Sequence, residues 1–145
     1  MLTRITTLAV FCVSVPLLAA ADEGKKAVRE LELNVTAPAD GSVARPRVIA
    51  TEAELTAAVP DAAVRARMAK AVDFDKEQLL LFVWSGSGQD KLTPEFKVLC
   101  SKSKESEVVF RYVPGDSTDK KGHARLFVVP KDKKTTWRVE TGKDK

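Results

Sequence analysis

The sequence contains few of the side chains on which catalytic and metal sites depend. Its 145 residues include one histidine, His123, and two cysteines, Cys12 and Cys100. A structural zinc site takes four ligands, mostly cysteine and histidine, and a cysteine nucleophile needs a nearby base such as imidazole to form its thiolate. The composition therefore predicts no catalytic residues, no metal and no cofactor, and it favours a protein that is not an enzyme.

The sequence also lacks a large excess of charge of either sign. It has 24 lysine and arginine residues against 20 acidic residues, a net charge of +4. Because proteins that bind nucleic acid concentrate positive charge on one face, we expect no nucleic-acid partner. The lysines gather in three predicted loops, where they keep turns soluble and would bind an anionic polymer weakly if the loops converged. These groups are Lys102/Lys104, Lys120/Lys121 and Lys131/Lys133/Lys134.

No apolar run has a comfortable length for a membrane span, which needs about 20 residues. The longest run, residues 5–18, is interrupted by Pro16, follows Arg4 and is followed by three alanines, 19–21. This layout is typical of a secretory signal peptide. We expect cleavage after Ala21, a secreted or periplasmic protein, and no stable membrane span after cleavage.

The mature chain would then comprise residues 22–145, which is enough for one globular domain with its own core. Its ends, near 22–27 and 141–145, are polar and are expected to fray.

Cleavage would leave a single cysteine, so we expect no internal disulfide. This cysteine, Cys100, alternates with Phe96 and Val98 on one face of a predicted strand. It is interpreted as a small buried hydrophobic residue.

The first half of the mature chain predicts two strands and then a helical segment. Residues 29–37 alternate between apolar and polar side chains, and residues 47–50 form a second short strand. Thr51 and Glu54 have the spacing of a capping box, which starts a short helix. Asp61 is placed to cap a second helix.

The second half predicts mostly β-structure. Six consecutive apolar residues, 79–84, predict a strand that is covered on both faces. Two hairpins are expected, one pairing residues 95–101 with 107–113 and the other pairing 123–129 with 135–140. The fold class is therefore α+β, an antiparallel sheet or small sandwich with one short helical segment inserted after the second strand.

The stretch Ser85-Gly86-Ser87-Gly88 follows the apolar strand and is the first candidate site. Its spacing matches neither a phosphate-binding loop nor a nucleophile elbow nor a dinucleotide fingerprint, and no helix is predicted after it. We expect glycines with positive φ that let the backbone turn. A second interpretation is a rim that contacts a ligand through an aromatic plate and polar groups, namely Trp84, Ser87, Gln89 and Asp90.

Residues 48–129 resemble the domain found at the C-terminus of PrcB-type proteins. The resemblance is carried by the helical segment EAELTAAV, the step Val72-Asp73-Phe74, the strand QLLLFVW and the glycines Gly86 and Gly88. Members of that family usually continue the turn as threonine, two glycines and tyrosine, where this chain has Gln89-Asp90-Lys91-Leu92. The resemblance implies an exported, non-enzymatic domain that associates with a protease or another envelope protein, and it implies no catalytic residues.

Three functions remain open from the sequence. The leading hypothesis is an exported, non-enzymatic binding or interaction domain that associates with an envelope protease or another protein. The alternatives are a small hydrolase or lyase that uses the glycine turn, Asp90 and His123, and a basic structural protein of the envelope. The candidate contact residues for a ligand or partner are Trp84, Ser87, Gln89, Asp90 and His123.

Overall fold

The computed structural model describes residues 28–32 and 41–142. The predicted signal peptide, residues 1–21, lies outside the described residues. So do positions 33–37 of the first predicted strand and the predicted frayed start of the mature chain.

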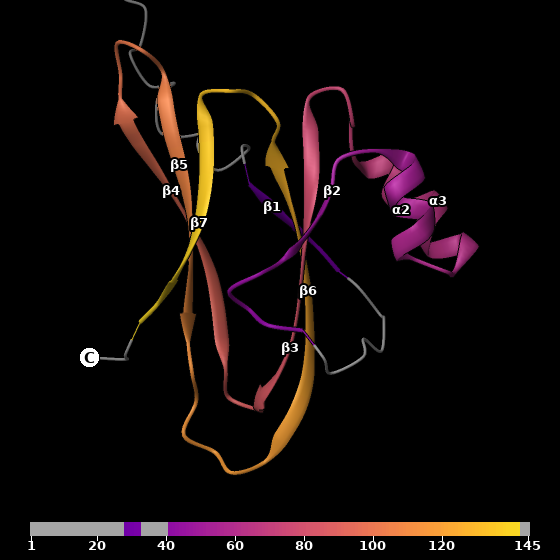
Figure 1. Ribbon diagram of the computed structural model, residues 1–145, viewed down its shortest axis with the longest axis vertical. Coiled ribbons are helices and arrows are strands. Elements are labelled where there is room, and N and C mark those ends of the chain that lie inside the picture. Colours follow the sequence, from indigo (N-terminus) through magenta and orange to yellow (C-terminus); the bar gives the residue numbers. More distant parts are fainter. Residues whose placement is uncertain (1–27, 33–40, 143–145) are drawn as a thin grey trace, which may run out of the picture.

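The described residues form two sheets and two helices, arranged in three layers (Figure 1). One sheet has four antiparallel strands in the order β1-β6-β3-β2, and the other has three strands in the order β4-β5-β7. In the three-stranded sheet β4 and β5 are antiparallel, whereas β5 and β7 are parallel. The helices lie between β2 and β3 in the sequence, as predicted. The elements are β1 (Arg29–Leu31), β2 (Arg47–Ile49), α2 (Glu52–Ala58), α3 (Ala62–Ala71), β3 (Glu77–Ser87), β4 (Lys91–Cys100), β5 (Glu105–Val113), β6 (Lys120–Pro130) and β7 (Thr135–Thr141).

Strand β3 lies at the centre of the molecule and is covered on both faces, which confirms the prediction from its apolar run. Because successive side chains of a strand point to opposite faces, Leu79 packs toward the helices while Leu80 and Phe82 pack toward the other sheet. The core between the sheets contains Leu80, Phe82, Trp84, Leu92, Val108, Phe110, Phe127 and Val129. The core beneath the helices contains Ile49, Leu55, Val59, Met68, Val72, Leu79, Leu126 and Val128.

Both helices begin at the predicted caps. The Thr51 hydroxyl accepts a hydrogen bond from the Glu54 backbone N–H at 3.2 Å, and the Glu54 carboxylate accepts one from the Ala50 N–H at 2.6 Å. The Asp61 carboxylate accepts hydrogen bonds from Ala63 N–H and Val64 N–H at 2.8 and 3.0 Å. The hydrogen bonds from Glu54, Ala63 and Val64 satisfy donors that the first helical turn leaves without partners.

The predicted hairpin between residues 123–129 and 135–140 is wrong. Strand β6 pairs with β1 along one edge and with β3 along the other, so it has no edge left for β7. Strand β7 instead pairs with β5, and the short turn after Pro130 carries the chain from one sheet to the other. The predicted hairpin between β4 and β5 is confirmed.

Two further expectations about the strands are also wrong. Cys100 is half-buried rather than buried, because β4 changes register between Val98 and Cys100 at the end of the sheet. Lys120 and Lys121 lie in strand β6, paired with Ser87 and Gly86, and not in a loop.

Candidate functional site

The structure brings the predicted site residues together at the end of the sandwich where β3 ends. The turn after Ser87 and the loop between β5 and β6 meet there, at the bottom of Figure 1. The resulting polar cluster comprises Trp84, Ser87, Gln89, Asp90, Tyr112, Gly115, Ser117 and His123.

Asp90 is the centre of the polar cluster. Its Oδ2 accepts hydrogen bonds from Trp84 Nε1–H at 3.0 Å and from the Tyr112 hydroxyl at 2.8 Å. Its Oδ1 accepts one from the Gly115 backbone N–H at 2.8 Å. One carboxylate therefore ties β3, β5 and the loop after β5 to one another.

These contacts change the acid strength of both partners. Partial burial by itself raises the pKa of Asp90, but hydrogen bonds from Gly115, Tyr112 and Trp84 outweigh it and hold that pKa below its usual value. Burial and the adjacent Asp90 carboxylate raise the pKa of the Tyr112 hydroxyl to about 12. Asp90 is thus held as an anion, and Tyr112 as its hydrogen-bond donor.

Ser87 and His123 are neighbours, but they are not arranged as a nucleophile and its base. Nε2 of His123 lies 2.8 Å from the backbone carbonyl oxygen of Ser87, so this nitrogen carries the proton and donates it. The Ser87 hydroxyl lies 2.8 Å from the Ser117 hydroxyl and accepts a hydrogen bond from the Gln89 N–H at 3.2 Å. A general base must reach the proton that it removes, and the His123 ring contacts the carbonyl of Ser87 instead of its hydroxyl.

The Trp84 ring is only 3% exposed. It stacks on the His123 ring, with centroids 4.8 Å apart and planes inclined at 13°. The predicted exposed aromatic plate is therefore wrong for Trp84, which acts from the interior as a donor to Asp90. Of the predicted contact residues, the exposed one is Gln89.

The glycines of this turn are needed for space and not for positive φ, so the expectation about their backbone is wrong. A Cβ at Gly86 would lie 1.9 Å from Asp90 Oδ2, and one at Gly88 would lie 2.6 Å from Asp119 Oδ2. Gly115 is similarly crowded by Gln89, with 2.6 Å between a built Cβ and Gln89 Cβ. Gly86 thus leaves room for the Asp90 carboxylate, and Gly115 leaves room for Gln89 while its N–H donates to that carboxylate.

A second candidate site lies at the opposite end of the sandwich, where the β4–β5 hairpin rises above the other strands (Figure 1). Its end exposes two neighbouring aliphatic side chains, Val98 at 64% and Leu99 at 59%. Strand β4 extends beyond the end of the facing sheet here, so no core residue covers Val98. Phe96, on the same face of β4, is partly buried. We call this region, residues 98–104, the hairpin end.

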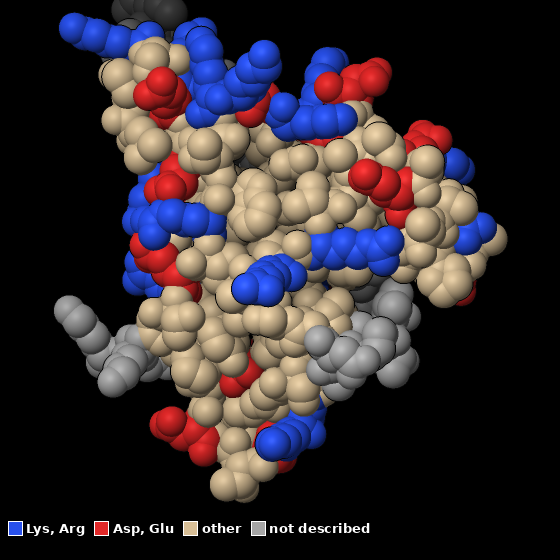
Figure 2. Space-filling view, viewed as in Figure 1, with Lys and Arg blue, Asp and Glu red and all other residues tan. Residues whose placement is uncertain are grey.

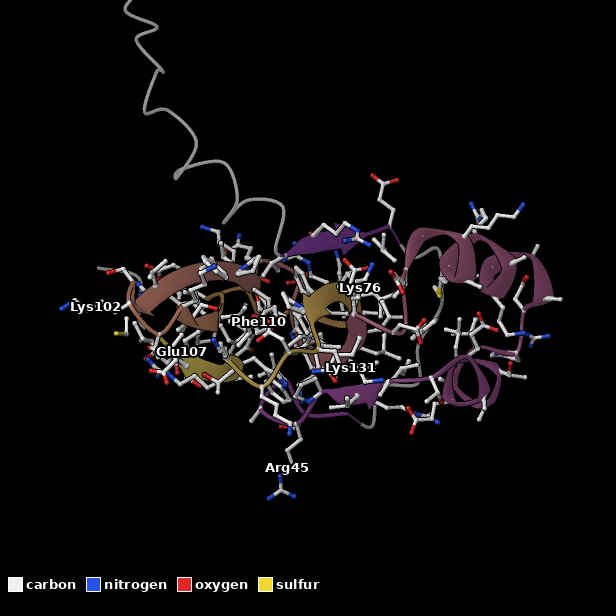
Figure 3. The ribbon with its side chains drawn as sticks, turned by 90° about the horizontal axis from the view of Figure 1, so that it is seen from above. Arg45, Lys76, Lys102, Glu107, Phe110 and Lys131 are labelled. Carbon is white, nitrogen blue, oxygen red and sulfur yellow. The ribbon has the colours of Figure 1, made fainter. Side chains whose placement is uncertain are left out.

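Lysines surround the hairpin end. Ser106 N–H donates to the carbonyl oxygen of Lys134 at 3.0 Å, which holds the β6–β7 turn beside the hairpin. In the space-filling view Lys and Arg side chains (blue) lie along the upper edge of the molecule, with Asp and Glu side chains (red) between them (Figure 2). Lys102 lies at the outer margin of the molecule and points away from the ribbon (Figure 3). Apart from Lys131, the exposed lysines of the two turns are Lys102, Lys104, Lys133 and Lys134.

The other lysines that the sequence grouped are used differently. The Lys131 ammonium donates to the carbonyl oxygens of Ala50 and Phe74 at 3.1 and 3.2 Å, so it joins the β6–β7 turn to the helical layer. Lys121 pairs with Asp119 at 3.4 Å at the end of the molecule that holds the polar cluster. Two of the three predicted lysine groups thus share one end, and the third lies at the other.

A small hollow and the searches for metal ligands and membrane spans complete the description of these residues. A hollow of about 150 Å³ lies between β1 and α3, lined by Leu31, Glu32, Val64, Arg67, Met68 and Ala71. It is smaller than the usual 300–1,000 Å³ of a ligand pocket. Within residues 28–32 and 41–142 no group of three or more histidine, cysteine or acidic side chains could hold a metal ion. No helix in these ranges is long and apolar enough to cross a bilayer.

No protein-family model, curated protein or solved structure matches the chain. Its function is therefore proposed from the geometry of the described residues.

Sequence reasoning selected Trp84, Ser87, Asp90 and His123 but missed Tyr112 and Ser117. Tyr112 alternates with Phe110 along β5, so it reads as a core position. The hairpin end was missed because Val98 alternates with Phe96 in the same way. In both cases the burial of the side chain depends on whether the facing sheet extends far enough to cover it, and alternation along one strand does not show this.

Tyr112 is the single tyrosine of the chain, so its titration can be followed without interference from another tyrosine. Its ultraviolet absorbance change should have a midpoint near pH 12 in the folded protein, against about 10 for a free tyrosine. Because the pKa is raised on folding, this contact stabilises the fold below about pH 10 and is lost as the pH rises toward 12. Asp90→Asn should lower the midpoint, with circular dichroism at each pH to monitor folding. A midpoint near 10 in folded wild-type protein would contradict the Tyr112–Asp90 contact.

Proposed function

We propose that this protein is a non-enzymatic interaction domain that binds its partner through the hairpin end. The observation that carries the proposal is the exposure of Val98 and Leu99, two adjacent aliphatic side chains at the outer end of a projecting hairpin. Single exposed apolar residues are common on protein surfaces. Here two of them project together among exposed lysines, whereas the core residues of the same sheet are fully enclosed.

The polar cluster supports the same proposal. The carboxylate oxygens of Asp90 accept three hydrogen bonds from groups that hold loops, and the imidazole of His123 is bound to a backbone carbonyl. The buried serine of the cluster, Ser87, is hydrogen-bonded to Ser117 and to the backbone of Gln89. These groups position the turn after β3 and the loop after β5, which supports a structural role for the polar cluster.

Export remains part of the proposal, as does association with an envelope protease or another envelope protein. These predictions rest on the N-terminal layout and on the resemblance to PrcB-type domains. The proposed contact surface differs from the rim around the glycine turn that the sequence favoured. The hairpin end lies at the opposite end of the sandwich from that turn.

One observation favours a second candidate, a basic structural protein of the envelope. Four exposed lysines from two turns lie at the same end of the molecule. Binding by exposed charges alone weakens strongly with salt, because exposed charges are screened over about 8 Å at physiological ionic strength. Binding that uses aliphatic side chains as well retains a component that salt does not remove.

Site-directed photocrosslinking tests the proposal. The chain from Asp22 to Lys145 has Cys100 as its single cysteine, and this half-buried thiol can carry a photoreactive maleimide beside Val98 and Leu99. After exposure to the envelope fraction of the source cells, adducts should form at Cys100 at both low and high salt. The double variant Val98→Ser/Leu99→Ser should reduce them at least tenfold, about the effect of losing one well-buried aliphatic contact.

The matched control places the same reagent at the other end of the molecule. Thr118 is exposed in the loop between β5 and β6, so Cys100→Ser/Thr118→Cys presents the label away from the hairpin end. Equal adducts from both positions would contradict the proposed surface. Adducts that are lost at high salt, and whose yield is the same in the Val98→Ser/Leu99→Ser variant, would favour the basic structural protein instead.

A further inference from the structure

The chemistry and shape of the hairpin end point to one kind of partner. We infer that it binds the surface of a lipid bilayer that contains anionic phospholipid. This inference rests on the proposed function, since it uses the same surface. It adds a lipid partner at that surface, beside the envelope protein that the proposed function names.

The shape of the hairpin end fits the surface of a bilayer. A specific protein interface buries about 800 Å² on each partner, spread over some 20–30 residues. The hairpin end presents two aliphatic side chains directly before the turn of a projecting hairpin, and Cys100 and Ser103 next to them are half-buried. A lipid headgroup layer, by contrast, admits a narrow projection and accepts aliphatic side chains at its boundary with the acyl chains.

The order of the side chains along the hairpin also suits insertion. Val98 and Leu99 are neighbours, and neighbouring strand residues normally point to opposite faces. The register change between Val98 and Cys100 falls here, and both aliphatic side chains are exposed. The chain turns back within Ser101–Lys104, where Lys104 has a φ of 56°. The hairpin end therefore carries an exposed aliphatic pair directly before a polar turn that contains two lysines.

The charges around that aliphatic pair complement an anionic surface. Lys102, Lys104, Lys133 and Lys134 are exposed, and none of them forms an ion pair with another residue of the ranges that the structure describes. A lysine close to an anionic leaflet contributes about a fivefold gain in binding. The cationic groups lie beside the aliphatic pair, as they do in elements that bind at the headgroup level.

Two acidic residues, Asp132 and Glu105, lie among the five lysines of these two turns. Asp132 is exposed, and its carboxylate accepts hydrogen bonds from the N–H groups of Lys134 and Thr135 at 2.8 and 2.7 Å and from the Thr135 hydroxyl at 3.1 Å. Glu105 is exposed and is the nearest opposing charge in the hairpin. At the other end of the molecule Lys121 is paired with Asp119. The uneven distribution of charge would orient the hairpin end toward an anionic surface.

Vesicle binding tests the inference directly. The protein used begins at Asp22, because the apolar run of residues 5–18 would bind lipid by itself. This chain keeps every residue of the two cores described above, and circular dichroism checks its folding. An environment-sensitive fluorophore is attached to Cys100, and vesicles of phosphatidylcholine with phosphatidylglycerol are compared with vesicles of phosphatidylcholine alone.

We expect the labelled protein to bind the mixed vesicles and the fluorophore at Cys100 to shift to the emission of an apolar environment. Lys102→Gln/Lys104→Gln should weaken binding about 25-fold, at about fivefold for each lysine. Val98→Ser/Leu99→Ser should weaken it about tenfold and remove the emission shift. The matched control Lys120→Gln/Lys121→Gln makes the same change of charge at the other end and should change binding less than twofold.

Several results would overturn the inference. Equal binding to both kinds of vesicle would exclude recognition of anionic lipid, and equal losses from the two lysine pairs would show attraction by net charge alone. If vesicles are not bound but the photoreactive Cys100 captures a protein that Val98→Ser/Leu99→Ser no longer captures, the lipid inference is wrong and the proposed function stands. If neither vesicles nor a protein depend on the hairpin end, both are wrong.

Discussion

Replacing Asp90 by alanine should lower the free energy of unfolding by about 2–4 kcal/mol. The substitution removes three hydrogen bonds to a charged group and leaves Trp84 Nε1–H without its acceptor inside the protein. A hydrogen bond to a charged group contributes about 1.5–3 kcal/mol, and a buried donor without a partner costs about 1–3 kcal/mol. Chemical denaturation followed by tryptophan fluorescence measures the change.

The controls for Asp90 separate the carboxylate from the loop around it. Asp116 is exposed in the loop after β5, and Asp116→Ala should change stability by less than about 0.5 kcal/mol. Asp90→Asn keeps the size of the side chain but turns an amide NH₂ group toward one of the donors. Its loss of stability should therefore lie between the losses for Asp90→Ala and Asp116→Ala. A stability loss from Asp90→Ala no greater than that from Asp116→Ala would contradict the structural role of the polar cluster.

The effect of Asp90 should also depend on pH. The pKa of its carboxyl is held low in the folded protein, so its contribution to stability is present above the unfolded-state pKa of about 3.9. It is lost as the pH falls through the folded-state pKa. The difference in stability between the wild type and Asp90→Asn should therefore be largest near neutral pH and should shrink below about pH 4.

This result bears on function as well as on folding. A carboxylate held for catalysis can often be replaced without loss of stability, because active-site groups are commonly retained at the expense of stability. A large loss at Asp90, together with the return of the Tyr112 pKa toward its usual value, would identify the polar cluster as a support for two loops. The hydrolase or lyase alternative would then need a reacting group from elsewhere in the chain.

The sequence predicts the elements of this fold better than it predicts their connections. The caps at Thr51 and Asp61 and the apolar run of β3 depend on residues close together in the chain, and each was interpreted correctly. The pairing of β7 depends on β6 having no open edge, which is a property of the whole sheet. The four apolar residues 126–129 of β6 do indicate coverage on both faces. A short polar turn, however, does not show whether the chain stays in one sheet or changes to the other.

The two candidate sites show the same limit. Trp84, Asp90 and His123 could be selected because polar and aromatic residues around a glycine turn are typical of sites. Their roles depend on Tyr112 and Gly115, which arrive from another strand and its loop. The exposure of Val98 depends on where the opposite sheet ends. The alternation of apolar and polar residues along β4 does not show where that sheet ends.

Phe82→Ala should be the most destabilising of the substitutions considered, with a loss of about 3–5 kcal/mol. The Phe82 side chain is fully buried between the sheets, and its ring centroid lies 4.8 Å from that of Phe110 and 5.7 Å from that of Phe127. Tilted and edge-on aromatic pairs add about 0.5–1.5 kcal/mol beyond the burial of their area. Removing the central ring leaves a cavity bounded by strands of both sheets, which cannot close without moving one sheet toward the other.

Phe96→Ala is the matched control, because it is the same substitution at the margin of the same core. Phe96 is partly exposed on β4, so neighbouring side chains and solvent can fill the space and the loss should be about 1–2 kcal/mol. The ratio of the two losses measures whether the sheets enclose a common core at Phe82, as the three-layer arrangement requires. Equal losses would mean that the sheets are not packed on each other at Phe82. The hairpin end would then no longer be a projection from a rigid sandwich, and the geometric basis for its binding to a bilayer would be lost.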